Sequence, residues 1–209
     1  PLFHKGNSWY ALNLAKDSIK RSNQAILMEG YLDVIQAHQA GFTQAVAALG
    51  TGLTKEQVGV LGRFTAEVIL AYDADTAGQN ATIRGMDILQ QAGLRVKILN
   101  LPPGEDPDSF IKQKGATIFK ESLEQALLLT DYKIKLVLET YNLKTPEAKD
   151  EAILAVFPQI ATVESSITRE AYIRQLAREV GVSEAAILSE FQAWVRKHRK
   201  KSPFLDNRP

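Results

Sequence analysis

Short apolar runs alternate with helical patterns through the first half of the chain. Four runs have the length of buried strands and end at polar, glycine or proline residues: 25–28, 45–49, 67–72 and 94–99. Between them, apolar residues recur at the spacing of amphipathic helices. Alternation of short apolar strands with helices is typical of βαβ units, which build a parallel sheet. The pattern therefore predicts an α/β domain with a four-stranded parallel sheet flanked by helices.

Local signals place the ends of some of these helices. Thr54 and Gln57 form a capping-box pattern at the start of "TKEQVGVLGRF". Gly41 is expected to end a helix that begins near Asp33, because glycine is common just after a helix. These signals agree with the strand assignments on either side.

Beyond Gly115 the apolar residues keep helical spacing, as in "DYKIKLVLETY" and "EAAILSEFQAWVRKH", and no strand pattern intervenes. We therefore expect a second, all-helical subdomain. The predicted divisions are a lead-in with one helix (1–23), the α/β domain (24–115), the helical subdomain (116–200) and a linker or tail (201–209).

Composition narrows the protein class only modestly. The chain has 209 residues, of which 45% are hydrophobic, and a net charge of +1. No run approaches the roughly 18 apolar residues of a membrane span, and no signal peptide is recognisable at the start. The absence of cysteine excludes disulfides and cysteine-ligated zinc within the chain. We expect a cytoplasmic monomer without a membrane partner and, because the chain opens on Pro1, a fragment of a longer protein.

Acidic residues follow three of the four predicted strands. In a parallel α/β sheet, ligands bind outside the carboxyl ends of the strands. Carboxylates gathered at one edge repel one another unless a cation joins them, and oxygen-only ligands favour Mg²⁺ or Mn²⁺. The three clusters are Glu29 with Asp33, Asp73 with Asp75, and Glu105 with Asp106 and Asp108.

Each acid also has a simpler interpretation. Asp75 or Thr76 would serve as a helix cap, and Asp108 would cap "SFIKQKG". Gly30 either lets backbone approach a ligand closely or forms a tight strand-to-helix turn. Glu29 does not fit the interpretation as a helix cap or a solvated residue, because it directly follows an apolar strand and precedes a glycine. A metal site remains the better explanation of the three clusters together.

The motifs "EGYLD", "YDADTAG" and "GEDPDSFI", in this order on a βαβ frame, resemble a Toprim domain, the metal-binding fold of topoisomerases and primases. The longer stretch "ILMEGYLDVIQAHQAGFTQAVAALGTGLT" resembles the bacterial replicative DNA primase family, of the DnaG type. "FHKGNSWYALNLA" resembles the segment before Toprim in that family, although its "WYAL" departs from the usual pattern. "YIRQLAREVGVSEAAI" resembles the family's helical subdomain.

The resemblance implies a nucleotidyltransferase that makes short RNA primers with two or three Mg²⁺ or Mn²⁺ ions. A single-stranded DNA template and ribonucleoside triphosphates would be its partners. The implied catalytic residues are Glu29, Asp33, Asp73 and Asp75; the implied metal ligands are Glu29, Asp73, Asp75, Asp106 and Asp108; and the implied nucleotide- or template-binding residues are Lys5 and Gly30.

Other parts of such an enzyme are not recognisable in this sequence. The family has an N-terminal zinc module, the only place where zinc is expected, and a basic subdomain that grips the template. It also has a C-terminal module through which we expect the replicative helicase to dock. We therefore expect this chain to bind metal but to synthesise little or no primer alone.

Three alternatives stay open at this point. "DADT", 73–76, also matches the D-x-D-x-T of haloacid dehalogenase-type phosphatases, but that class leaves "EGYLD" unexplained. Another Toprim enzyme, a nuclease or a topoisomerase, would share the shorter motifs. "IRQLAREVGVSEAAILSEF" has the outline of a DNA-binding helix-turn-helix, yet Glu184 and the alanines after it are poor base readers, so a structural helix pair is favoured.

Overall fold

The computed structural model describes residues 5–48, 52–72, 86, 88–102 and 104–198. The chain divides into two compact units, Pro1–Leu129 and Thr130–Pro209, and each is described by itself. Among the described residues, no helix has both the length and the apolar character needed to cross a membrane.

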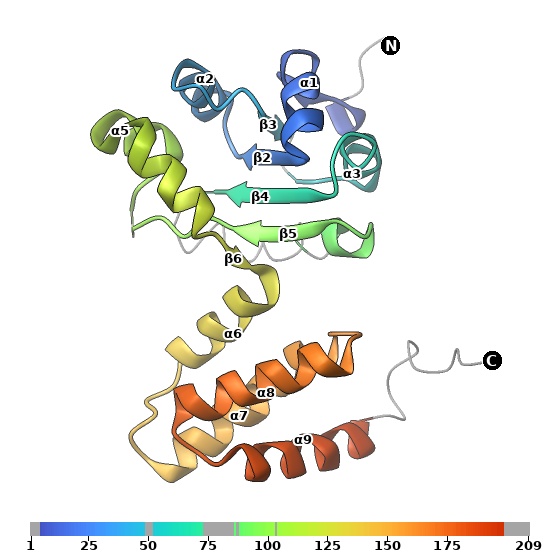
Figure 1. The fold of residues 1–209 in the computed structure, drawn as a ribbon, viewed down its shortest axis with the longest axis vertical. Coiled ribbons are helices and arrows are strands. Elements are labelled where there is room, and N and C mark those ends of the chain that lie inside the picture. The colour runs from blue at the N-terminus through green and yellow to red at the C-terminus, as the bar shows by residue number, and fades with distance from the viewer. Residues whose placement is uncertain (1–4, 49–51, 73–85, 87, 103, 199–209) are drawn as a thin grey trace, which may run out of the picture. The chain divides into compact units, whose positions relative to one another are not determined.

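A mixed sheet lies at the centre of the first unit (Figure 1). Its order is β1-β3-β2-β4-β5-β6. The four central strands are parallel, as predicted: β3 (Ala45–Ala48), β2 (Gln24–Met28), β4 (Glu67–Ala71) and β5 (Arg95–Ile98). The prediction missed two short antiparallel strands at the edges, β1 (Trp9–Tyr10) beside β3 and β6 (Leu127–Leu128) beside β5.

Helices α2 (Tyr31–Gln39) and α5 (Pro107–Glu124) cover one face of this sheet. Ile26 and Met28 of β2 pack in one cluster with residues of both helices. The intervening residues Ala25 and Leu27 are also fully buried, and alternation along a strand directs them to the opposite face. Helix α1 (Leu12–Ser22) contacts β2 and β3. Both faces are therefore apolar, as the near-continuous hydrophobic strands require.

The lead-in belongs to the first unit because it is bonded to helix α3 (Lys55–Leu61). The indole of Trp9 donates to the carbonyl of Gln57 at 2.9 Å, and the Gln57 amide donates to the carbonyl of Ser8 at 3.0 Å. The predicted capping box at the start of α3 is confirmed: Thr54 Oγ1 accepts from Gln57 N–H, and Gln57 Oε1 accepts from Thr54 N–H. A short 3-10 helix, η1 (Lys5–Asn7), precedes β1.

Gly115 marks a break inside α5 rather than the end of the first unit. Its φ of 85° is non-helical, so α5 consists of two helical pieces. The second piece carries Phe119 and Leu123 into the same apolar cluster as β2, and Phe119 meets Phe42 edge-on with ring centroids 4.9 Å apart. The first compact unit therefore ends at Leu129, later than the predicted boundary at Gly115. The four predicted divisions stay a proposal about functional parts.

The second unit is all-helical, as predicted. Its elements are α6 (Leu129–Glu139, whose first residue lies in the first unit), α7 (Pro146–Ala161), α8 (Ser166–Val180) and α9 (Glu184–His198). Phe157 of α7, Leu176 of α8 and Phe191 of α9 meet in one apolar core. Glu184 pairs with Arg174 of α8 at 3.4 Å. The start of α9 is thus paired with α8, as expected for a structural helix pair.

Candidate functional site

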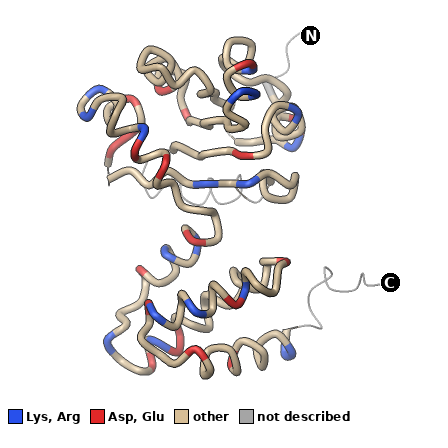
Figure 2. Tube along the Cα trace, in the orientation of Figure 1, with Lys and Arg blue, Asp and Glu red and all other residues tan. Residues whose placement is uncertain are grey.

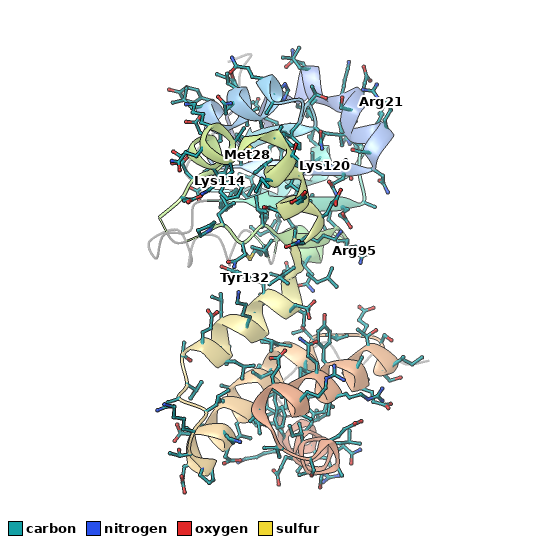
Figure 3. The ribbon with its side chains drawn as sticks, turned by 60° about the vertical axis from the view of Figure 1, so that its left-hand side comes forward. Arg21, Met28, Arg95, Lys114, Lys120 and Tyr132 are labelled. Carbon is teal, nitrogen blue, oxygen red and sulfur yellow. The ribbon has the colours of Figure 1, made fainter. Side chains whose placement is uncertain are left out.

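The carboxyl ends of β2, β4 and β5 point to one edge of the sheet (Figure 1). Met28, the last residue of β2, is in register with Ala71, the last residue of β4. Figure 3 shows Met28 and Lys114 toward this edge and Arg21 and Arg95 toward the opposite one. The topology therefore brings the carboxyl ends of three parallel strands to one edge of the sheet.

Glu29 comes directly after β2 and is exposed at this edge. Burial raises the pKa of the Tyr72 hydroxyl, and the negative charge of Glu29 raises it further. Since Tyr72 directly follows β4, Glu29 lies close enough to the end of that strand to act on its electrostatics. The residues after Tyr72, including the predicted site residues Asp73 and Asp75, lie outside the described part of the chain.

Helix α2 begins at Tyr31, close to Asp33, as predicted. Asp33 lies in the first turn of the helix, and its Oδ2 accepts a hydrogen bond from the backbone N–H of Gly30 at 3.0 Å. A carboxylate in this position satisfies an N–H that would lack an intrahelical partner, and the helix dipole favours its charge. Gly30 has ordinary extended dihedrals, so its turn does not need a glycine.

The second oxygen of the same carboxylate reaches across to another helix. Asp33 Oδ1 accepts a hydrogen bond from the backbone N–H of Asp108, in the first turn of α5, at 3.2 Å. Burial raises the pKa of Asp33; the hydrogen bonds from Gly30 and Asp108 oppose this, while the charges of Asp106 and Asp108 add to it. The predicted acidic motifs "EGYLD" and "GEDPDS" are thus in direct contact.

Asp106, rather than Asp108, caps helix α5. Asp106 Oδ1 accepts from the backbone N–H of Ser109 at 2.7 Å, and its Oδ2 accepts from the Ser109 hydroxyl at 3.0 Å. Pro107 occupies the first helical position, where its missing N–H costs nothing. Asp108 instead forms a 2.6 Å ion pair with Lys112, one turn along. The simpler interpretation of Asp108 as the cap of this helix is therefore wrong.

The carboxylates described at this edge are of the type that binds a hard divalent cation. They do not by themselves form a complete cation site. The described residues contain no group of three ligands of the metal-binding type. However, Oε2 of Glu105 is buried and has no hydrogen-bond partner within the described part of the chain. A buried carboxylate oxygen without a donor is costly, and a cation would satisfy it. Glu105 was in the predicted acidic cluster but not among the predicted site residues; its buried oxygen has no signature in sequence.

Two family models match the chain. A Toprim-like model matches residues 26–111, which run from within β2 through β3, β4 and β5 to the start of α5. A model described as the DnaB-helicase binding domain of primase matches residues 130–185, within the helical unit. This second match corrects the expectation that helicase docking would involve only a C-terminal module beyond this sequence, because a model named for helicase binding matches residues 130–185.

Curated relatives and solved structures agree with these matches. A DNA primase of Clostridium acetobutylicum is 38% identical over 197 residues, which cover 94% of this chain and 33% of the relative. The RNA polymerase domain of the Mycobacterium tuberculosis primase DnaG, in complex with double-stranded DNA, is similar with a TM-score of 0.76 at 29% identity, covering 87% of this chain and 59% of that one. A DnaG catalytic domain bound to single-stranded DNA is similar with a TM-score of 0.69 at 30% identity, covering 88% and 59%.

The chain spans about a third of the length of the first curated relatives that it matches.

Proposed function

Since the chain belongs to the bacterial DNA primase family, of the DnaG type, we propose that it forms the metal-binding and helical part of a primase polymerase core. The activity proposed for the complete enzyme is synthesis of short RNA primers for DNA replication by nucleotidyl transfer. Its partners are a single-stranded DNA template, ribonucleoside triphosphates and the replicative helicase. Alone, this third of the enzyme binds metal but makes little primer.

The bond from Asp108 N–H to Asp33 Oδ1 carries this proposal. It joins two acidic motifs that are 75 residues apart in sequence, at the edge of the sheet where Glu29 follows β2 and Tyr72 follows β4. A Toprim site needs this meeting of motifs from different strands. Acids that served only as local helix caps would have no reason to converge.

Carboxylates at this edge would hold Mg²⁺ or Mn²⁺. The proposed ligands are Glu29, Asp106 and Asp108, together with Asp73 and Asp75. The ions supply charge stabilisation for a triphosphate and activation of an attacking hydroxyl. The chain's own contribution is orientation: the two helix N-termini at Asp33 hold their loops side by side, and their N–H groups favour an anionic surrounding. Lys5 is proposed to contact nucleotide or template.

Manganese binding by the intact chain tests the proposal. We expect wild type to bind Mn²⁺ in isothermal titration calorimetry and Glu29→Gln to bind it at least tenfold more weakly. Glu56→Gln, on the exposed surface of α3, is the matched control and should bind like wild type. A haloacid dehalogenase-type phosphatase would keep its metal after Glu29→Gln, so unchanged binding would refute the Toprim assignment.

The helicase partnership rests on the family-model match to 130–185. Sedimentation of the chain with a bacterial replicative helicase tests it directly. Co-sedimentation would place a docking surface within this chain. Separate sedimentation at micromolar concentrations would place the docking surface elsewhere in the full-length enzyme.

A further inference from the structure

The requirement for glycine at position 30 comes from Asp33. An added Cβ on Gly30 would lie 2.8 Å from Asp33 Oδ2, closer than such atoms approach in proteins. The backbone at Gly30 is ordinary extended chain with φ of −105°, which any residue adopts. The glycine is therefore needed to let the Asp33 carboxylate lie against the backbone, not to shape the turn.

This carboxylate uses both oxygens on backbone groups of two different segments. Oδ2 accepts from Gly30 N–H, next to Glu29, and Oδ1 accepts from Asp108 N–H, next to the cap that Asp106 provides. Both donors belong to helix N-termini, where N–H groups lack intrahelical partners. One side chain thus sets the separation between the loop that carries Glu29 and the loop that carries Asp106.

We propose that Asp33 is a positioning residue and not a metal ligand. It can take this role because Gly30, which has no Cβ, leaves room for its carboxylate against the backbone. This inference rests on the proposed function, because the loops that it ties carry the proposed ligands Glu29, Asp106 and Asp108. It replaces the direct catalytic role that the sequence suggested for Asp33, and it assigns Gly30 to Asp33 rather than to nucleotide.

Loss of the tie should act locally. Helices α2 and α5 also pack through Val34, Ala37, Phe110 and Ile111, which are all buried in one cluster. These apolar contacts keep the two helices on the same face of the sheet without Asp33. Only the short segments ahead of the helices, which carry the acids, lose their mutual restraint.

Two variants break the tie by different routes. Asp33→Asn keeps one acceptor oxygen and turns an amide N–H₂ toward the other backbone donor. Gly30→Ala alters no acidic side chain but displaces the Asp33 carboxylate. Gly59→Ala is the control glycine, since an added Cβ there meets nothing within 4 Å. We expect each of the first two variants to weaken Mn²⁺ binding by about tenfold or more, and the double variant to be no weaker than either alone.

Hydrogen exchange, followed by NMR on the same proteins, supplies a readout that does not depend on metal. We expect the Asp108 amide to exchange at least tenfold faster in Asp33→Asn and in Gly30→Ala than in wild type, with strand amides unchanged. Unchanged Asp108 exchange, or losses in Mn²⁺ affinity that add fully in the double variant, would overturn the inference. Faster Asp108 exchange in a chain whose wild type binds no Mn²⁺ would overturn the proposed function and with it the positioning of ligands.

Discussion

Glu67 on β4 accepts a 2.9 Å hydrogen bond from Lys97 on the neighbouring strand β5. The same carboxylate accepts from the Gln24 amide on β2 at 2.6 Å, and Arg95 lies 3.6 Å from its other oxygen. Figure 2 shows this pattern as an acidic segment on β4 beside basic segments on β5. One side chain therefore joins three parallel strands at the edge opposite the candidate site.

Replacing Glu67 by Gln should make stability less dependent on pH. Burial works to raise the pKa of Glu67, but hydrogen bonds from Lys97 and Gln24 and the nearby positive charges outweigh it, so the pKa lies below its ordinary 4.5. A lowered folded pKa contributes stability above the unfolded value and loses it as pH falls through the folded pKa. We expect Glu67→Gln to lose about 1 kcal/mol at pH 7 and the difference from wild type to shrink below pH 4.5.

Urea unfolding between pH 3 and pH 7 measures this difference. Glu121→Gln, at an exposed site on α5, should show no such trend. A constant difference between Glu67→Gln and wild type across that range would contradict the electrostatic account.

Replacing Glu105 by Gln should stabilise the metal-free chain while weakening metal binding. Its buried Oε2 has no hydrogen-bond partner among the described residues, so this oxygen has lost water without gaining a donor. A neutral amide lowers that cost. In the presence of a chelator, we expect the free energy of unfolding to rise by about 1 kcal/mol. Thermal unfolding in EDTA measures the expected gain in stability, and thermal unfolding in Mn²⁺ measures the expected loss of stabilisation by metal. Glu124→Gln is the exposed control. A loss of stability in EDTA would show that the oxygen is satisfied.

Asp106→Ala should destabilise the first unit more than Asp108→Ala does. Removal of a helix N-cap costs about 1 kcal/mol, and Asp106 also holds the Ser109 hydroxyl. Within the described part of the chain, the Asp108 carboxylate is paired with Lys112, an i,i+4 ion pair with a half-exposed lysine worth about 0.3–0.5 kcal/mol. Urea unfolding of the two variants side by side tests this order. If Asp108→Ala destabilised the chain more than Asp106→Ala, Asp108 and not Asp106 would be the helix cap.

Phe119→Ala should unfold the first unit preferentially. Phe119 is fully buried, and truncation of such a side chain costs about 3–5 kcal/mol. Hydrogen exchange should show lost protection in β2 and β4 but not in α8, whereas Phe157→Ala should show the opposite pattern. Lost protection in α8 after Phe119→Ala would mean that the second piece of α5 belongs with the helical unit.

The parallel sheet could be predicted because its four strands are buried on both faces. Such strands read as uninterrupted apolar runs, and "EVILAY" and "QAILM" need no partner to be recognised. The edge strands β1 and β6 have two residues each, too few for any periodic signal. Their pairing depends on the positions of β3 and β5 in the folded sheet, which the local sequence of β1 and β6 does not determine.

The candidate site shows the same division between local and distant causes. The sequence "EDPDS" does contain a signal for the cap, because proline favours the first helical position and so points to Asp106 as the residue before it. No local pattern announces the bond from Asp108 to Asp33, since it spans 75 residues. Gly115 was predicted as a domain boundary; it interrupts α5 instead, and the burial of Phe119 beyond it decides which unit the second piece joins.

The two-residue strands at the margins of the sheet also bear on solubility. A long outer strand with unpaired N–H and C=O groups is a template for other chains, and very short edge strands remove most of it. β1 covers part of β3, and β6 covers part of β5, while Trp9 and Ser8 are fastened to α3 through Gln57. A shortened chain lacking residues 1–11 would uncover β3, and we expect it to aggregate through strand addition during expression or storage.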